Sequence, residues 1–136
     1  MTGSGPGRMT GSGRGSGPVP PGWPGAVAPP GTPDWEQSAT EWLIDLCPAD
    51  FRGYPVLRRH PLGLAWLAGK HVEGATQAMA RALGRARAEL GEDLRPGVLD
   101  QFLQTLELEQ ARLMAAARGV DLIEQALRGR RHIPRL

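Results

Sequence analysis

The sequence has a single cysteine, Cys47, and a single lysine, Lys70, and it contains no apolar run of about 20 residues. One cysteine excludes an intramolecular disulfide framework and favours a reducing compartment. The lack of a long apolar run argues against a transmembrane segment, and the N-terminal region has no apolar stretch of the kind that a signal peptide carries. Together these absences predict a cytoplasmic protein.

Side chains that build metal centres and catalytic triads are also scarce. Cys47, His60 and His71 do not have the C-x-x-C or H-x-x-x-H spacing of zinc sites. The Glu-x-x-His motif of carboxylate-bridged metal sites in helical bundles does not occur. Ser38 lies inside an expected helix, without the strand–turn–helix elbow of a nucleophilic serine. The sequence therefore predicts no enzyme, no cofactor and no metal site.

Glycine and proline are abundant, and they gather at one end. Residues 1–33 contain 10 Gly and 8 Pro, and their only charged residues are Arg8 and Arg14. Such a composition cannot bury enough apolar surface to offset the entropy of the chain, so residues 1–33 are predicted to be a disordered leader. Its stretch Pro18–Pro21 could serve as a polyproline ligand, and the alternative is a merely flexible extension.

The strongest periodic pattern lies in residues 96–128. Read at alternating steps of three and four, eight of its nine seam positions are apolar, as in a coiled-coil helix packed against a partner. Pro96 suits the first helical position and Gly129 suits the stop. The polar exception is Glu109, which either sets the helix register or points outward. The predicted helix–helix interface consists of Leu99, Phe102, Leu106, Leu113, Val120, Ile123 and Leu127.

Two further helices are expected before this one. Residues 61–90 form a long helix with a seam of small residues, and the short turn at 91–95 makes it an antiparallel neighbour of the last helix. A shorter helix runs from Asp34 to about Cys47, where a following proline disfavours helical geometry. The predicted fold is all-α: a helical domain at 34–128 in which the short helix packs on a long antiparallel hairpin.

Residues between these helices are irregular, with one helical turn expected at 55–59. The run from Cys47 to Leu67 begins CPADFRGYPVLRR. It resembles stretches in uncharacterised small helical proteins of actinobacteria that carry the signature CP-x-D-[FY]-RGY-x-VLRR. The resemblance covers roughly residues 34–136 and implies no known activity, cofactor or site. Phe51, Tyr54, Val56 and Leu57 are expected to fill the space where the short helix meets the long ones.

Charge is unevenly distributed. Residues 34–127 carry 10 basic and 14 acidic side chains, whereas residues 129–136 are predicted to form a basic, non-helical tail. The antiparallel hairpin brings two groups of arginines to one end, which predicts a surface for an anionic partner. The alternative is that they complement a helix dipole. The residues concerned are Arg58, Arg59, Arg128, Arg130 and Arg131.

A short helix of about 20 Å cannot cover a hairpin of about 45 Å, so apolar side chains remain exposed. Such patches usually mark binding surfaces, and a second copy is the simplest partner. The sequence therefore predicts a non-enzymatic helical protein–protein interaction or scaffold protein that forms a homodimer or binds another helical protein. The alternative is a small nucleic-acid-binding or regulatory protein that uses the arginine-rich end, although an acidic core disfavours nucleic acid.

Overall fold

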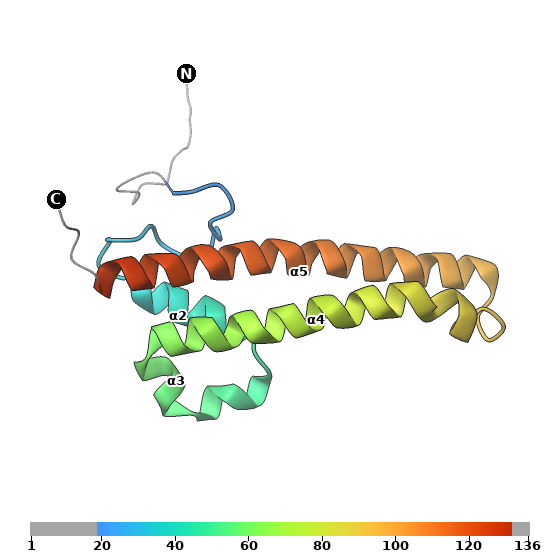
Figure 1. Ribbon diagram of the computed structural model, residues 1–136, viewed down its shortest axis with the longest axis horizontal. Helices are drawn as coiled ribbons and strands as arrows, with labels where there is room; N and C mark the ends of the chain where they lie inside the picture. The colour runs from blue at the N-terminus through green and yellow to red at the C-terminus, as the bar shows by residue number, and fades with distance from the viewer. Residues whose placement is uncertain (1–18, 132–136) are drawn as a thin grey trace, which may run out of the picture.

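Two long helices joined by a tight turn form the frame of the protein (Figure 1). The computed structural model describes residues 19–131. Within that range the elements are α2 (Trp35–Asp45), η2 (Ala49–Gly53), α3 (Pro55–Arg59), α4 (Pro61–Leu90) and α5 (Pro96–Arg131). No strand occurs among these residues. The predicted all-α fold, a long antiparallel hairpin with a short N-terminal helix packed on it, is confirmed.

Prolines set the starts of three helices. Pro55, Pro61 and Pro96 each occupy the first helical position, where the missing backbone N–H would have no partner inside the helix. α4 then continues for 30 residues without interruption although it contains four glycines. A glycine costs a helix only about 1 kcal/mol relative to alanine, which the packing of such a long helix can offset.

Helix α5 extends further than predicted. It passes through Gly129 and ends at Arg131, so the prediction that the tail begins at residue 129 is wrong for residues 129–131. The residues around Gly129 are arginines, which favour helix, and the first strict obstacle along the chain is Pro134. The rest of the predicted tail, residues 132–136, lies outside the described residues.

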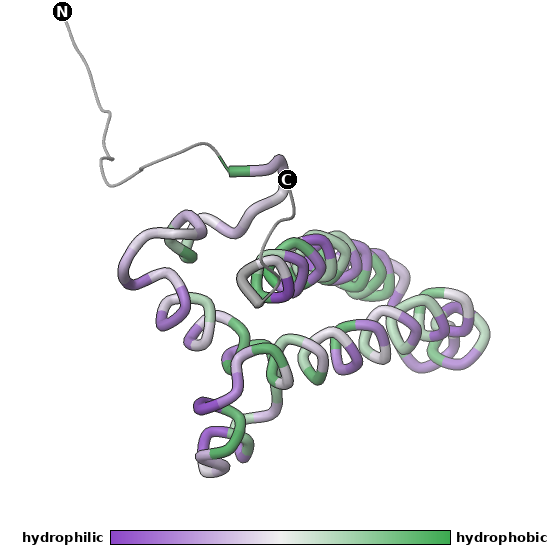
Figure 2. Tube along the Cα trace, turned by 60° about the vertical axis from the view of Figure 1, so that its left-hand side comes forward, coloured by the Kyte–Doolittle hydropathy of each residue, from purple (hydrophilic) through white to green (hydrophobic). Residues whose placement is uncertain are grey.

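The main core lies at the end of the hairpin where α4 begins and α5 ends (Figure 1). Ala39, Leu43 and Ile44 of α2 are almost completely buried there, together with side chains of both long helices. Figure 2 brings this end forward and shows the chain before α2 above that helix and the η2–α3 segment below α4. The other core residues from the long helices are Leu64, Ala65, Ala68, Val120, Ile123 and Leu127.

Residues 19–33, which we call the strap, belong to this core. Val27 is only 4% exposed, and Trp23 and Ala28 pack against the same cluster. The prediction of a disordered leader through residue 33 is therefore wrong for residues 19–33, and residues 1–18 lie outside the described residues. Burial of two apolar side chains, Trp23 and Val27, orders this segment despite its glycine and proline content. Its prolines also help, because proline restricts the unfolded chain and so reduces the entropy that is lost on folding.

The far end of the hairpin consists of α4 and α5 alone (Figure 1). We call residues 80–110 the arm. Its buried cluster contains Ala86, Leu99 and Leu103, and no residue of α2 reaches it. A small intermediate cluster of Val72, Leu113 and Ala116 joins the arm to the main core. One end of the hairpin therefore carries α2 and the strap packed on it, whereas the other end is formed by α4 and α5 alone.

Candidate interaction surfaces

The arginines that were predicted to bind an anionic partner make different contacts within the chain. Arg58 forms an ion pair with Glu41 of α2, and Arg128 forms one with Glu124 one turn earlier on α5. Arg59 has no ion pair within residues 19–131. These contacts satisfy part of the positive charge locally. The side chains of Arg130 and Arg131 lie outside the described residues.

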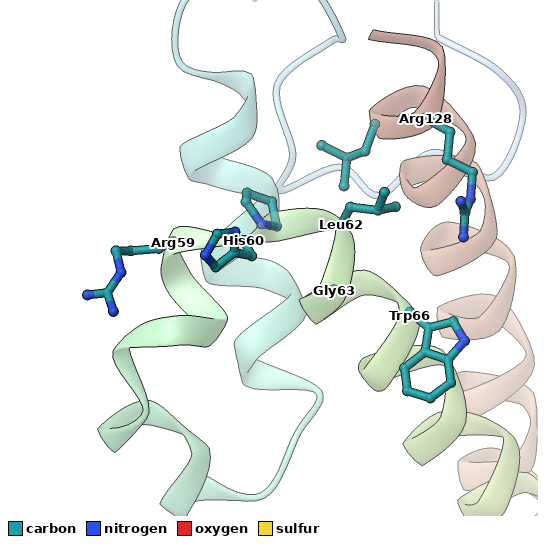
Figure 3. A pocket seen from close by; sticks show the side chains of 8 residues that line it. Arg59, His60, Leu62, Gly63, Trp66 and Arg128 are labelled. Carbon is teal, nitrogen blue, oxygen red and sulfur yellow. The ribbon is translucent and has the colours of Figure 1, made fainter. Parts of the chain in front are cut away.

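Arg59 and Arg128 nevertheless flank one cavity of about 450 Å³ between the start of α4 and the end of α5 (Figure 3). Trp66, whose ring is about half exposed, stands at its margin. In Figure 3 the Arg59 side chain points away from the cavity, while Arg128 lies on the opposite side, toward Trp66. The two guanidinium groups therefore do not converge on one ligand position. The remaining lining residues are His60, Pro61, Leu62, Gly63 and Leu127.

A second hollow between α4 and α5 shares Trp66 and Arg128 with this cavity. The ammonium of Lys70 lies 5.5 Å from the centre of the Trp66 ring, which is within the range of a cation–π contact. Asp121 and Glu124 also line this second hollow, which has a volume of about 460 Å³. Acidic and basic groups thus alternate beside Trp66, and the surface is mixed rather than uniformly cationic.

The predicted helix–helix interface is distributed along the whole hairpin. Val120, Ile123 and Leu127 lie in the main core, Leu113 lies in the intermediate cluster, and Leu99 lies in the arm cluster. Leu106 packs against the arm cluster and is partly buried. Val72 and Leu113 share a cluster, in agreement with the antiparallel register expected from the turn at residues 91–95.

Phe102 differs from this pattern. Its ring is 39% exposed, whereas the neighbouring Leu103 is 8% exposed and takes its place in the core. The prediction of Phe102 as a buried seam residue is wrong, because the contact face of a straight helix drifts relative to a strict seven-residue repeat. The expected plug residues Tyr54 and Val56 are also more than half exposed, and only Phe51 and Leu57 pack on the core.

Phe102 forms part of a groove on one side of the arm. The groove has a volume of about 500 Å³. Its apolar lining comes from Ala82, Ala86 and Leu90 of α4 and from Phe102 of α5. Arg81, Arg85 and Glu89 line its polar edge. Sequence reasoning identified uncovered apolar residues but not this groove, because seven-residue counting placed Phe102 in the seam between the helices.

Glu109 lies on α5 seven residues after Phe102, and therefore on the same face of that helix about two turns away. Its carboxylate accepts hydrogen bonds from Arg112 of the same helix, including one of 2.8 Å from Nε. That hydrogen bond, together with the positive charge of Arg112, lowers the pKa of Glu109 below its usual value. The Glu109 side chain is 38% exposed. The local ion pair favours the outward alternative for this residue.

The single cysteine lies in the main core. Cys47 is only 8% exposed, and burial raises the pKa of its thiol. Nearby, the imidazole of His71 packs edge-on against Phe51, with ring centres 5.1 Å apart. Residues 19–131 contain no group of three or more His, Cys, Asp or Glu side chains placed to hold a metal ion.

No helix within residues 19–131 is long and apolar enough to cross a membrane. No family model matches the chain, and searches of curated proteins and of solved structures found no match to it. The resemblance to uncharacterised actinobacterial proteins therefore stays a prediction.

Proposed function

We propose that this protein is a non-enzymatic helical interaction protein that pairs with a second copy of itself through the groove on the arm. The observation that carries the proposal is the position of that groove. By helix periodicity its α4 residues lie on the face of α4 that packs into the main core at the other end, and no residue of α2 reaches the arm. We further propose that the protein acts in the cytoplasm, the compartment that its single cysteine favours.

The main core provides an internal example of how this side accepts a helix. Ala39 and Leu43 of α2 bury themselves in one cluster with Leu64 and Ala68 of α4. At 3.6 residues per turn, eighteen residues correspond to five turns, so positions 82 and 86 lie on the same side of α4 as positions 64 and 68. Of these two positions, Ala86 is already buried against Leu99 and Leu103 of α5, whereas Ala82 stays partly exposed in the groove and is open to a partner.

The arm leaves apolar side chains exposed that a partner could cover. Its buried cluster is small, and Val98 and Phe102 are 42% and 39% exposed. Apolar side chains gathered along a groove are typical of association surfaces, and two hairpins that bury such faces form a four-helix bundle. An isologous dimer is the commonest way to achieve this.

The charged residues around the groove on the arm favour a second copy of the chain as its binding partner. The groove edge on α4 carries both signs, with Arg81 and Arg85 beside Glu89. On α5, Glu109 lies two helical turns after Phe102 and pairs with Arg112 of the same helix. Under a twofold axis each basic group meets the partner's edge, which offers acidic groups in return. Arg85 already pairs with Glu89, and Arg112 with Glu109, so this edge is close to neutral and offers little attraction to a partner with one sign of charge.

The molar mass in solution, measured by light scattering at low and high salt, tests this proposal. The full chain should be a dimer whose stability changes little with salt, because apolar contacts dominate. Phe102→Asp should shift the mass to that of a monomer while helicity is retained. Leu108→Asp is the matched control, since Leu108 is 72% exposed and lies away from the groove. A monomeric wild-type chain, or equal effects of the two variants, would contradict the proposal.

The arginine-flanked cavity supports a second candidate, a small nucleic-acid-binding or regulatory protein. The observation in its favour is that Arg59 and Arg128 flank the same cavity as the exposed Trp66 ring, which could stack on a base. Binding to phosphates should then weaken steeply with salt and should be lost in Arg59→Ala. Asp121 and Glu124 beside Trp66 weigh against this function, so self-association is the better supported of the two.

A further inference from the structure

We infer that the cleft between α2 and α5 is a peptide-recognition site. Residues 22–28 of the strap are its ligand within the same chain, and the same segment of a second copy can occupy it in trans. This site lies in the main core and shares no residue with the groove on the arm. The inference therefore does not depend on the proposed mode of self-association.

Two apolar side chains of the strap enter the cleft. Val27 is only 4% exposed, and the Trp23 ring lies 6.1 Å from the ring of Trp35, at the start of α2. The spacing of four residues brings both side chains to the same side of a compact turn. Short peptides are commonly recognised through a few apolar anchors of this kind.

Hydrogen bonds inside the segment hold the turn in shape. The backbone N–H of Trp23 donates to the carbonyl of Pro20 over 3.0 Å, and that of Val27 donates to the carbonyl of Pro24 over 3.1 Å. The indole N–H of Trp23 also donates to the Val27 carbonyl over 2.9 Å. A ligand that supplies its own turn loses less conformational entropy on binding.

The cleft supplies complementary features from two helices. On α2, the Ser38 hydroxyl accepts the backbone N–H of Ala28 over 2.9 Å and donates to the Trp35 carbonyl. On α5, Gly119 leaves room for the ring of Pro24, and a Cβ atom at this position would lie 2.8 Å from Pro24 Cγ. The cleft thus offers the turn both a hydrogen-bond partner and a complementary shape.

Gly31, in the connection to α2, is the hinge that the inference requires. Gly31 has a positive φ of 89°, and a Cβ atom at this glycine would meet no atom within 4 Å. Rotation at this glycine would displace residues 22–28 without altering α2. Because the segment is tethered, its effective concentration is on the order of millimolar, so it normally excludes a copy supplied in trans.

A labelled peptide of residues 19–33 tests the inference by fluorescence anisotropy with full-chain variants. Val27→Asp should prevent docking of the tethered segment, and this variant should bind the wild-type peptide saturably. The wild-type protein should bind the peptide at least tenfold more weakly, because its cleft is occupied. The double variant Val27→Asp with Gly119→Leu is the matched control, in which the new side chain fills the cleft and binding should be lost.

Circular dichroism measures whether each variant keeps its helices. If Val27→Asp loses helicity, the milder Val27→Ala takes its place in the same assay. Loss of helicity in both variants would show that the segment is an inseparable part of the core and would overturn the inference. A folded variant that does not bind the peptide, or a Gly119→Leu double variant that binds it equally well, would overturn it too.

Discussion

Gly119 of α5 lies directly against the indole of Trp42 of α2, so closely that a Cβ atom on this glycine would come within 2.9 Å of Trp42 Cη2. The close approach brings α2 and the strap onto α5 at the same point. It also explains a glycine in the middle of a long helix, where glycine is otherwise unfavourable.

Gly119→Ala should destabilise the protein. The added methyl group must push away Trp42 and Pro24, and such overpacking costs about 1–3 kcal/mol, which exceeds the gain in helix propensity of up to about 1 kcal/mol. Urea denaturation followed by circular dichroism measures the difference. Gly84→Ala is the matched control, because a Cβ atom at Gly84 meets nothing within 4 Å. That substitution should stabilise the protein, and a stabilising Gly119→Ala would contradict the close contact.

Val27→Ala should lower the free energy of unfolding by about 1–3 kcal/mol, because a buried valine loses two methyl groups and leaves a cavity. Val56→Ala is the comparison, since Val56 is 53% exposed. Its effect should stay within about 0.5 kcal/mol. Thermal unfolding of both variants gives the answer, and equal shifts in Tm would mean that the strap contributes nothing to the core.

These contacts also show what the sequence can and cannot specify. The seam periodicity and the prolines at helix starts are local signals, and they define α4 and α5 almost to the residue. The strap has no such period, because Trp23 and Val27 act through a long-range contact with Trp35 and Ser38. Composition alone therefore describes it as disordered.

The candidate surfaces also combine features that the sequence predicts with features that depend on packing in three dimensions. Sequence placed Arg59 and Arg128 at one end of the hairpin, and they do flank one cavity. The directions of their side chains depend on local packing and could not be read from spacing. The groove at Phe102 was missed because seven-residue counting placed that ring in the seam, while the actual helix turns Leu103 inward.

Leu113→Asp should unfold the protein or separate its long helices. Leu113 is 5% exposed in the cluster that joins the arm to the main core, and burying an unpaired carboxylate there would cost more than about 3 kcal/mol. Met114→Asp provides the control on the next residue, because Met114 is 61% exposed. Far-ultraviolet circular dichroism should show strong loss of helicity only for Leu113→Asp. Normal helicity and mass in that variant would contradict the register of α5 against α4.

Cys47 should react slowly with thiol reagents in the native protein. Its side chain is buried and its thiol pKa is raised by that burial, so little thiolate is present near neutral pH. Reaction with a chromogenic disulfide should accelerate strongly in denaturant, where the thiol is exposed and its pKa returns to the ordinary value. Rapid labelling under native conditions would show that the core around α2 opens readily.

The ion pair of Glu109 with Arg112 should make a small part of the stability depend on pH. Because the hydrogen bond from Arg112 lowers the pKa of Glu109 in the folded state, its contribution is present above the ordinary carboxyl pKa and is lost as the pH falls through the lowered value. An exposed pair on one helix contributes only about 0.2–0.5 kcal/mol. Glu109→Gln should therefore lower the urea midpoint slightly at pH 7, and this effect should diminish as the pH falls through the lowered pKa. In an Arg112→Ala background the same substitution should have no effect at pH 7, and a persistent effect there would assign the role of Glu109 to another contact.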